Sequence, residues 1–221
     1  MAAYEQSPKI RDLFIRGQPL SFGRGDVIIG NEPAPDGIYY ISTGYVKCYS
    51  ISKDGDEYMH IIYGSGEIFP LLWAYLEIPE TPLFYEAIST CSLWRIAREW
   101  FSTYTQKDPE LCYAMSVQLA QQFRMFTNRI DNLEYKRARD RLIYRLLYLA
   151  SRFGTRDGDS VIIEAPLTHE IFASSINLSR ESVSREMEKL YEEKIIEKTS
   201  DTKIRVINPD MLRARLGITD V

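Results

Sequence analysis

The stretch that most constrains the fold is residues 166–199, PLTHEIFASSINLSRESVSREMEKLYEEKIIEKT. Its first part predicts a short helix around Ile171–Ala173, and residues 174–178 predict a tight turn. Ser179 is a good N-cap for a second helix. Apolar residues then recur at helical spacing, at Val183, Met187 and Leu190. A short helix, a turn and a longer helix with one polar face predict a helix-turn-helix, and residues 195–206 add a two-stranded wing.

The exposed face at the start of the second helix carries the chemistry of base recognition. Arginine can bond guanine bidentately, and glutamate can accept a hydrogen bond from the cytosine amino group. That face holds Ser179, Arg180, Glu181, Ser184 and Arg185. Such a cluster is more often a solvated helix face, but the cap, the turn and the wing together favour double-stranded DNA as partner. Phosphate contacts are then expected from Thr168, from Ser179 and from Lys203 in the wing.

The net charge of the chain is −4, which is unusual for a nucleic-acid-binding protein of uniform composition. The charge is unevenly distributed, however. Residues 137–221 carry a net charge of +1, and the preceding part carries −5. Because binding depends on a local basic surface, the acidic total does not exclude DNA, although it predicts weak, salt-sensitive non-specific binding.

The rest of the composition indicates a cytoplasmic protein. No basic segment followed by an apolar core opens the chain, and no apolar run is long enough for a membrane span. Cys48, Cys91 and Cys112 are odd in number and widely spaced, which is typical of reduced cysteines. Neither His60 nor His169 lies near a cysteine in the sequence. We therefore expect no metal site and no cofactor.

Residues 19–98 predict a β-roll, because short alternating runs are separated by glycine and proline turns. A helical period follows, and Asp108-Pro109-Glu110 is a strong helix start. The predicted fold is therefore α+β with two domains. These are an N-terminal jelly-roll-like β-roll at 1–107 and a winged helix-turn-helix at 137–221, joined by a long dimerisation helix at 108–136.

The long helix carries a heptad seam that predicts a homodimer. The seam residues assigned to the dimer interface are Met115, Leu119, Gln122, Phe126 and Leu133. Apolar residues off the seam, at Val117, Phe123 and Ile130, could instead pack on the β-roll of the same chain. Packing of the whole helix on its own roll is the alternative interpretation.

The order of β-roll, long helix and winged helix-turn-helix resembles the cyclic-AMP receptor protein/fumarate-nitrate regulator (CRP/FNR) family of bacterial transcription factors, from about residue 15 to residue 208. The sharpest segment is residues 179–185, which fits the family patterns R-E-x-x-x-R and E-x-x-S-R. The resemblance implies that Arg180, Glu181, Ser184 and Arg185 read TGA-containing half-sites in an inverted repeat. It also implies contact with RNA polymerase and a cyclic-nucleotide-binding-like roll.

The roll departs from the cyclic-nucleotide pattern, because no arginine lies between Gly64 and Ser92 to hold a phosphate. Cyclic AMP is therefore not expected, and the effector is unknown. Aromatic and apolar residues occupy this stretch instead, at Phe69, Leu71, Leu72, Trp73, Phe84 and Tyr85. They either line a pocket for an apolar effector or fill the roll.

A second class of function is a metabolite-binding β-roll whose helical C-terminal domain binds a protein partner instead of DNA. An enzyme is not expected, because the roll has no paired carboxylates with a nearby base, no Ser/His/Asp set and no phosphate loop.

Overall fold

The computed structural model describes residues 7–30, 34–76, 81–200 and 202–218. These residues form two compact units, and the boundary between them falls inside the long helix α4 (Pro109–Glu134), between Met125 and Phe126. The α+β class and the two-domain organisation predicted from the sequence are confirmed. The expected segment limits at 108 and 136 do not mark this boundary, because the first part of α4 belongs to one unit and its last turns belong to the other.

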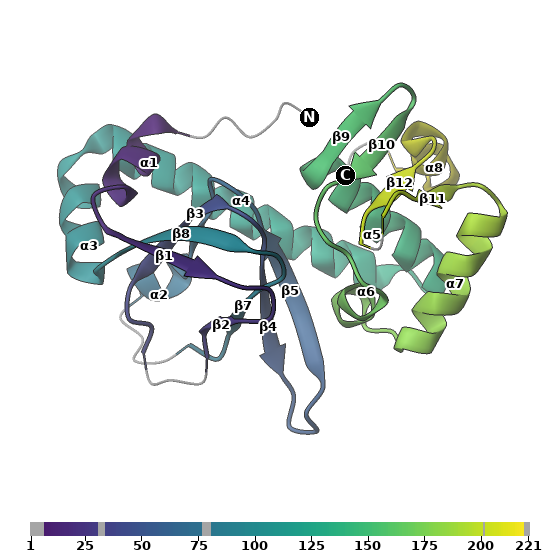
Figure 1. Ribbon diagram of the computed structural model, residues 1–221, viewed down its shortest axis with the longest axis horizontal. Coiled ribbons are helices and arrows are strands. Elements are labelled where there is room, and N and C mark those ends of the chain that lie inside the picture. Colours follow the sequence, from purple (N-terminus) through teal and green to yellow (C-terminus); the bar gives the residue numbers. More distant parts are fainter. Residues whose placement is uncertain (1–6, 31–33, 77–80, 201, 219–221) are drawn as a thin grey trace. The chain divides into compact units, whose positions relative to one another are not determined.

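The N-terminal unit is a β-roll of two four-stranded antiparallel sheets (Figure 1). One sheet has the order β1-β8-β3-β6 and the other has the order β2-β7-β4-β5. The strands are β1 (Gln18–Phe22), β2 (Val27–Ile29), β3 (Ile38–Thr43), β4 (Val46–Ile51), β5 (Glu57–Tyr63), β6 (Ile68–Phe69), β7 (Phe84–Ala87) and β8 (Cys91–Ile96).

Strand β3 shows why the roll needs apolar residues at successive positions. Tyr39 and Ile41 belong to the core between the two sheets, whereas Ile38 and Tyr40 pack on the helices outside. Side chains alternate between the two faces of a strand, and both faces of β3 are covered, so all four positions are buried. This strand therefore joins two apolar clusters.

The turn between β3 and β4 depends on Gly44. Its φ is +98°, which is rare for residues with a side chain, and an added Cβ would lie 2.5 Å from the carbonyl oxygen of Thr90. The sequence prediction of glycine turns between the strands is consistent with that geometry.

Helices α1 (Pro8–Phe14), α2 (Leu71–Tyr75) and α3 (Arg98–Lys107) cover one side of the roll. The sequence interpretation did not predict α1 or α2. Phe14 of α1 stacks on Tyr40 with ring centroids 5.7 Å apart, and Phe101 of α3 packs in the same cluster. Helix α2 forms within the stretch that the sequence interpretation treated as β-structure, and its residues Leu71, Trp73 and Ala74 are buried in the cluster beneath the helices.

Helix α4 begins where the sequence predicted. The carboxylate of Asp108 accepts hydrogen bonds from the backbone N–H groups of Glu110 and Leu111, at 3.0 and 3.1 Å. Further along, Gln118 and Gln122 are buried against the roll, where they donate to the carbonyl oxygens of Gly66 (3.1 Å) and Ile68 (2.9 Å). The first part of α4 is thereby tied to strand β6 and the corner before it.

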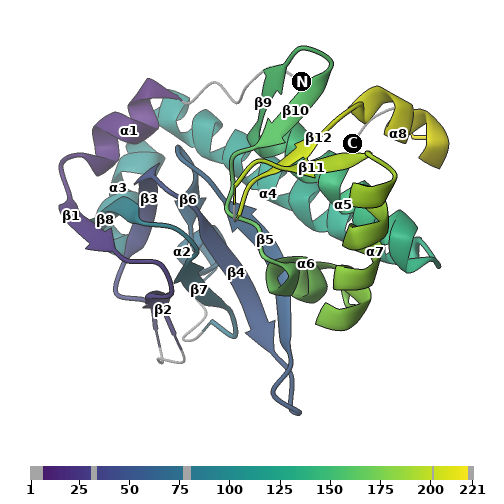
Figure 2. The same ribbon diagram turned by 45° about the vertical axis from the view of Figure 1, so that its right-hand side comes forward.

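The C-terminal unit is a winged helix-turn-helix (Figure 2). Its antiparallel sheet has the order β11-β12-β10-β9, and α7 lies against α6 in both views. The elements after α4 are α5 (Ala138–Phe153), β9 (Gly154–Asp157), β10 (Ser160–Ile163), α6 (His169–Ile176), α7 (Arg180–Glu192), β11 (Ile196–Lys198), β12 (Ile204–Val206) and α8 (Pro209–Leu216).

Three details of this unit differ from the sequence interpretation. Helix α6 continues to Ile176, so the turn begins at Asn177 rather than at residue 174, because Asn177 adopts the left-handed conformation (φ 52°) that ends the helix. Residues 154–157 form strand β9, paired with β10, which the sequence interpretation did not predict. Helix α8 was not predicted. Asp201, in the expected wing turn, lies outside the described residues.

In the described ranges no helix combines the length and the hydropathy that a bilayer span requires. The same ranges contain no group of three or more histidine, cysteine or acidic side chains placed to hold a metal ion. Cys48 is buried in the roll, and burial raises the pKa of its thiol to about 12.

Candidate nucleic-acid interface

Helix α7 is amphipathic, and its polar face is the candidate reading surface. Its apolar residues Val183, Met187 and Leu190 are buried in the C-terminal unit. The opposite face has a shallow depression lined by Arg180, Glu181, Ser184, Arg185 and Glu188. The structure thus brings the four predicted base-reading side chains together on one surface, which we call the reading face.

Ser179, the predicted cap, and Thr168, a predicted phosphate contact, both cap helices. The Ser179 hydroxyl accepts from the backbone N–H of Ser182 at 3.2 Å, and the Thr168 hydroxyl accepts from that of Ile171 at 3.2 Å. These caps fix the N-termini of α7 and α6, where exposed N–H groups and the helix dipole favour an anion.

The carboxylate of Glu181 is held in its ionised form. Its own backbone N–H and then the Ser179 hydroxyl lower the pKa of Glu181, and the charges of Arg180 and Arg185 lower it further. The side chain therefore acts as a hydrogen-bond acceptor at neutral pH.

One contact of the reading face was missed by the sequence interpretation, which treated His169 as an ordinary histidine. Nδ1 of His169, at the start of α6, lies 2.8 Å from the hydroxyl oxygen of Ser184. Burial lowers the pKa of His169, and the neighbouring charge of Arg180 lowers it further. No local pattern signals this pair, because its members are 15 residues apart.

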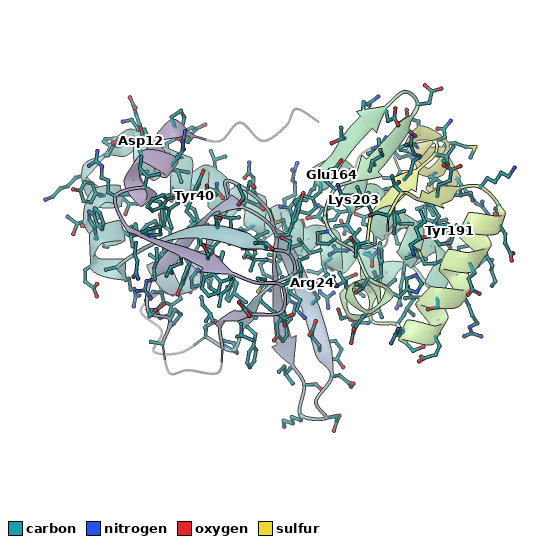
Figure 3. All side chains as sticks on the ribbon, in the orientation of Figure 1. Asp12, Arg24, Tyr40, Glu164, Tyr191 and Lys203 are labelled. Carbon is teal, nitrogen blue, oxygen red and sulfur yellow. The ribbon has the colours of Figure 1, made fainter. Side chains whose placement is uncertain are left out.

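A cleft of about 450 Å³ separates the wing from the two helices. We call it the wing cleft, and its lining includes Thr168, His169, Arg180, Lys198 and Lys203. Lys203, the predicted wing contact, forms an ion pair with Glu164, with Nζ 2.5 Å from Oε2 (Figure 3). The cationic side chains in this lining suit an anionic ligand such as a phosphate group.

In comparison with known proteins, each of the two units matches the model of a known domain family. Residues 19–108 match the model of the cyclic nucleotide-binding domain, and residues 140–215 match the Crp-like helix-turn-helix domain. The chain belongs to the CRP/FNR family of transcription regulators. Regulators of this family bind DNA and act as dimers.

Relatives in the CRP/FNR family match most of the chain. The CRP-like cAMP-activated global transcriptional regulator of Mycobacterium tuberculosis is 28% identical over 168 residues, 76% of this chain and 75% of the relative. The nitrogen fixation regulation protein FixK of Azorhizobium caulinodans is 27% identical over 215 residues, 96% and 85% of the two chains. The structure of FixK2 from Bradyrhizobium japonicum has the same fold, with a TM-score of 0.76 at 22% identity over 89% of this chain and 96% of that one.

The dimerisation helix expected for a CRP/FNR protein is α4, but its predicted interface register needs correction. Met115 is fully buried and Gln122 is 8% exposed, both against the roll of their own chain, so neither is accessible to a second copy. In contrast, Phe123 is 71% exposed and Ile130 is 59% exposed, although the sequence interpretation offered them as candidates for packing on the roll. Leu133 is half-buried.

The exposed apolar side chains of α4 form a heptad seam of their own. They follow steps of four, three and four residues at Leu119, Phe123, Phe126 and Ile130. Such a pattern is the one that pairs two helices. We call this set the α4 stripe.

The six residues predicted to line an effector pocket do not share one site. Phe69 and Tyr85 stack inside the roll with ring centroids 4.9 Å apart, whereas Leu71 and Trp73 belong to the cluster beneath the helices. Leu72 is exposed, and Phe84 stacks on Tyr49. These positions fit the alternative interpretation, in which the side chains fill the roll.

Proposed function

We propose that the protein is a homodimeric transcription regulator that reads an inverted repeat of TGA-type half-sites. The observation that carries this proposal is the reading face, where Arg180, Glu181, Ser184 and Arg185 lie on the exposed side of a capped helix. Arginine forks suit guanine, and the ionised carboxylate suits the cytosine amino group. The proposal includes RNA polymerase as a further partner, because the family resemblance implies it.

Phosphate groups would be held on either side of the reading face. The N–H groups at the start of α6 and α7, capped by Thr168 and Ser179, supply one set of donors. Lys198 and Lys203 of the wing cleft supply positive charge. Because such contacts carry no sequence information, they position the protein while the reading face discriminates bases.

Dimerisation would occur through the α4 stripe. Two parallel copies of α4 would bury Leu119, Phe123, Phe126 and Ile130 against one another and set the separation of the two reading faces. An inverted repeat is the DNA counterpart of such a two-fold axis.

We further propose that cyclic AMP is not the effector. The stretch between Gly64 and Ser92 contains no arginine, and the aromatic side chains Phe69 and Tyr85 occupy the interior of the roll. A cyclic phosphate needs a bidentate cation or a nest of N–H groups.

Fluorescence anisotropy tests the proposed function. The ligand-free protein is titrated into a labelled inverted-repeat TGA duplex and into a scrambled duplex of equal length at physiological salt, with and without added cyclic AMP. Binding to the inverted repeat is expected to be at least about a thousandfold tighter than binding to the scrambled duplex, with no effect of cyclic AMP. Equal affinity for the two duplexes in both conditions would contradict the assignment of the half-site.

Binding should also strengthen as the pH falls from 7 towards 5.5. Burial and then Arg180 lower the pKa of His169, with Lys198 adding to the effect and Glu188 opposing it, so the free protein holds a neutral imidazole at pH 7. Glu170 and Lys203 also line the cleft. Phosphates at the wing cleft would favour the imidazolium, raise its pKa and cause proton uptake on binding. A tenfold gain in the proton affinity of His169 would strengthen DNA binding by about tenfold at most for each half-site.

Calorimetry in buffers of different ionisation enthalpy measures this proton uptake. His169→Gln should abolish the uptake, whereas His60→Gln should retain it, and these are the two histidines of the chain. Uptake that persists in the His169→Gln variant would assign the proton to another group.

A further inference from the structure

Two arginine side chains connect the last turns of α4 to the helix-turn-helix within the C-terminal unit. The first is Arg129, which is 8% exposed. Its Nη1 donates to the carbonyl oxygen of Ser175 at 2.6 Å, and its Nη2 donates to the side-chain oxygen of Asn177 at 3.2 Å. One guanidinium group therefore holds both the end of α6 and the turn that follows it.

The second is Arg141, near the start of α5. Its Nε donates to the carbonyl oxygen of Tyr135 at 2.7 Å, and its two terminal nitrogens approach the carbonyl oxygens of Leu133 (3.3 Å) and Ile176 (3.4 Å). Arg141 thus contacts the end of α4, the link to α5 and the end of α6 with a single planar group.

Further hydrogen bonds join α4 directly to α5. Asn132 donates from its side chain to the carbonyl oxygen of Arg141 at 2.7 Å, and the Tyr144 hydroxyl lies 3.2 Å from the side-chain oxygen of Asn128. The link at residues 135–137 is therefore braced from several directions.

The chemistry explains why arginine occupies these positions. The C-terminus of a helix leaves up to four carbonyl groups without partners and carries partial negative charge. Both α4 and α6 direct such carbonyl groups at Arg129 or Arg141. A guanidinium group has five donors in a fixed plane, so it can hold several acceptors at defined angles, which a lysine cannot.

The turn after α6 makes the direction of α7, the helix that carries the reading face, depend on the position of the end of α6. After Ile176 the chain has Asn177 in the left-handed conformation, then Leu178, whose N–H donates to the carbonyl oxygen of Ala173 at 3.1 Å, and then the α7 cap Ser179. Only three residues separate the two helices, so the direction of α7 follows from the position of the end of α6.

We propose that Arg129 and Arg141 are positioning residues for DNA reading, which fix the angle between the last turns of α4 and the recognition helix α7. On the proposed function of an inverted-repeat-reading dimer, they set the spacing between half-sites that the dimer accepts. The link at residues 135–137, which these hydrogen bonds brace, is then not the place where the DNA-binding unit is re-aimed.

The test separates spacing from base recognition. Arg129→Met and Arg141→Met remove the guanidinium group and keep an apolar side chain. Each variant is titrated into duplexes whose half-sites are separated by the preferred spacer, or by one base pair more or fewer, and into a preferred-spacer duplex with one altered half-site base. We expect the spacing preference to fall from about tenfold to below about threefold, while discrimination against the altered base persists.

Controls exclude a merely structural role. Arg137→Met removes an exposed arginine from the same joint and should keep the wild-type spacing preference. Asn177→Gly suits the left-handed conformation and removes only one acceptor of Arg129, so it should relax spacing even if Arg129→Met fails to fold. Arg129→Lys should restore little of the spacing preference, because a lysine lacks the planar set of guanidinium donors.

The outcomes are distinct. Unchanged spacing preference in folded Arg129→Met and Arg141→Met, or in Asn177→Gly where those do not fold, overturns this inference and leaves the proposed function intact. A wild-type protein that does not prefer the inverted repeat overturns the proposed function itself.

Discussion

Replacing Arg185 with alanine is expected to weaken binding to the inverted-repeat duplex by about 5- to 150-fold per half-site, with little change on a scrambled duplex. Arg185 is exposed on the reading face, where its Nη2 lies 3.4 Å from the hydroxyl oxygen of Ser182. Its loss should therefore cost base discrimination and leave folding intact. Anisotropy on both duplexes measures the ratio of the two affinities.

Lys189→Ala is the matched control for this prediction. Lys189 lies on the same helix, carries the same charge and pairs with Glu186 at 2.7 Å, but it lies one turn beyond the reading face. Its removal should lower both affinities slightly and leave their ratio unchanged. If Arg185→Ala instead kept the wild-type ratio, the assignment of the reading face would be wrong.

The double variant Phe123→Glu/Ile130→Glu is expected to make the protein monomeric at micromolar concentration. Both side chains are mostly exposed on the α4 stripe, so the substitutions disturb little within one chain. Burial of each apolar side chain contributes about 1.5–3 kcal/mol, and a two-fold interface contains each of them twice. Carboxylates at these positions should therefore weaken dimerisation by several orders of magnitude, as measured by sedimentation equilibrium.

Binding to the full inverted repeat should fall with dimerisation, because each monomer would hold only one half-site. Leu72→Glu provides the control, since Leu72 is an exposed leucine of the roll outside the α4 stripe. It should leave the dimer intact. A dimer that survived the double substitution would place the interface on another surface.

The sequence predicted the order of domains and the starts of α4 and α7 because those signals are local. Asp108 and Ser179 cap their helices through residues two or three positions away, and the apolar run of β3 is visible in four consecutive residues. The reading face could also be predicted from the sequence, since Arg180 and Arg185 lie on one helix. These features depend on neighbours in the chain.

The register of α4 could not be predicted in the same way. The helix has two apolar faces, and the buried one includes glutamine residues whose partners are carbonyl groups in strand β6 and its preceding corner. A heptad pattern identifies a stripe but not which surface covers it. The pairs His169–Ser184 and Arg129–Ser175 were missed for a related reason, because each joins residues that only the folded chain brings together.

The acceptors of Arg129 and Arg141 have a consequence for how such regulators diverge. Four of the five are main-chain oxygens, which remain in place when the side chains of the same residues are replaced. After gene duplication, a descendant can therefore exchange the residues of its reading face and acquire a new operator without losing the geometry of the dimer on DNA. Inheritance of the two arginines would preserve the spacing of operators in a lineage while their base sequences drift apart.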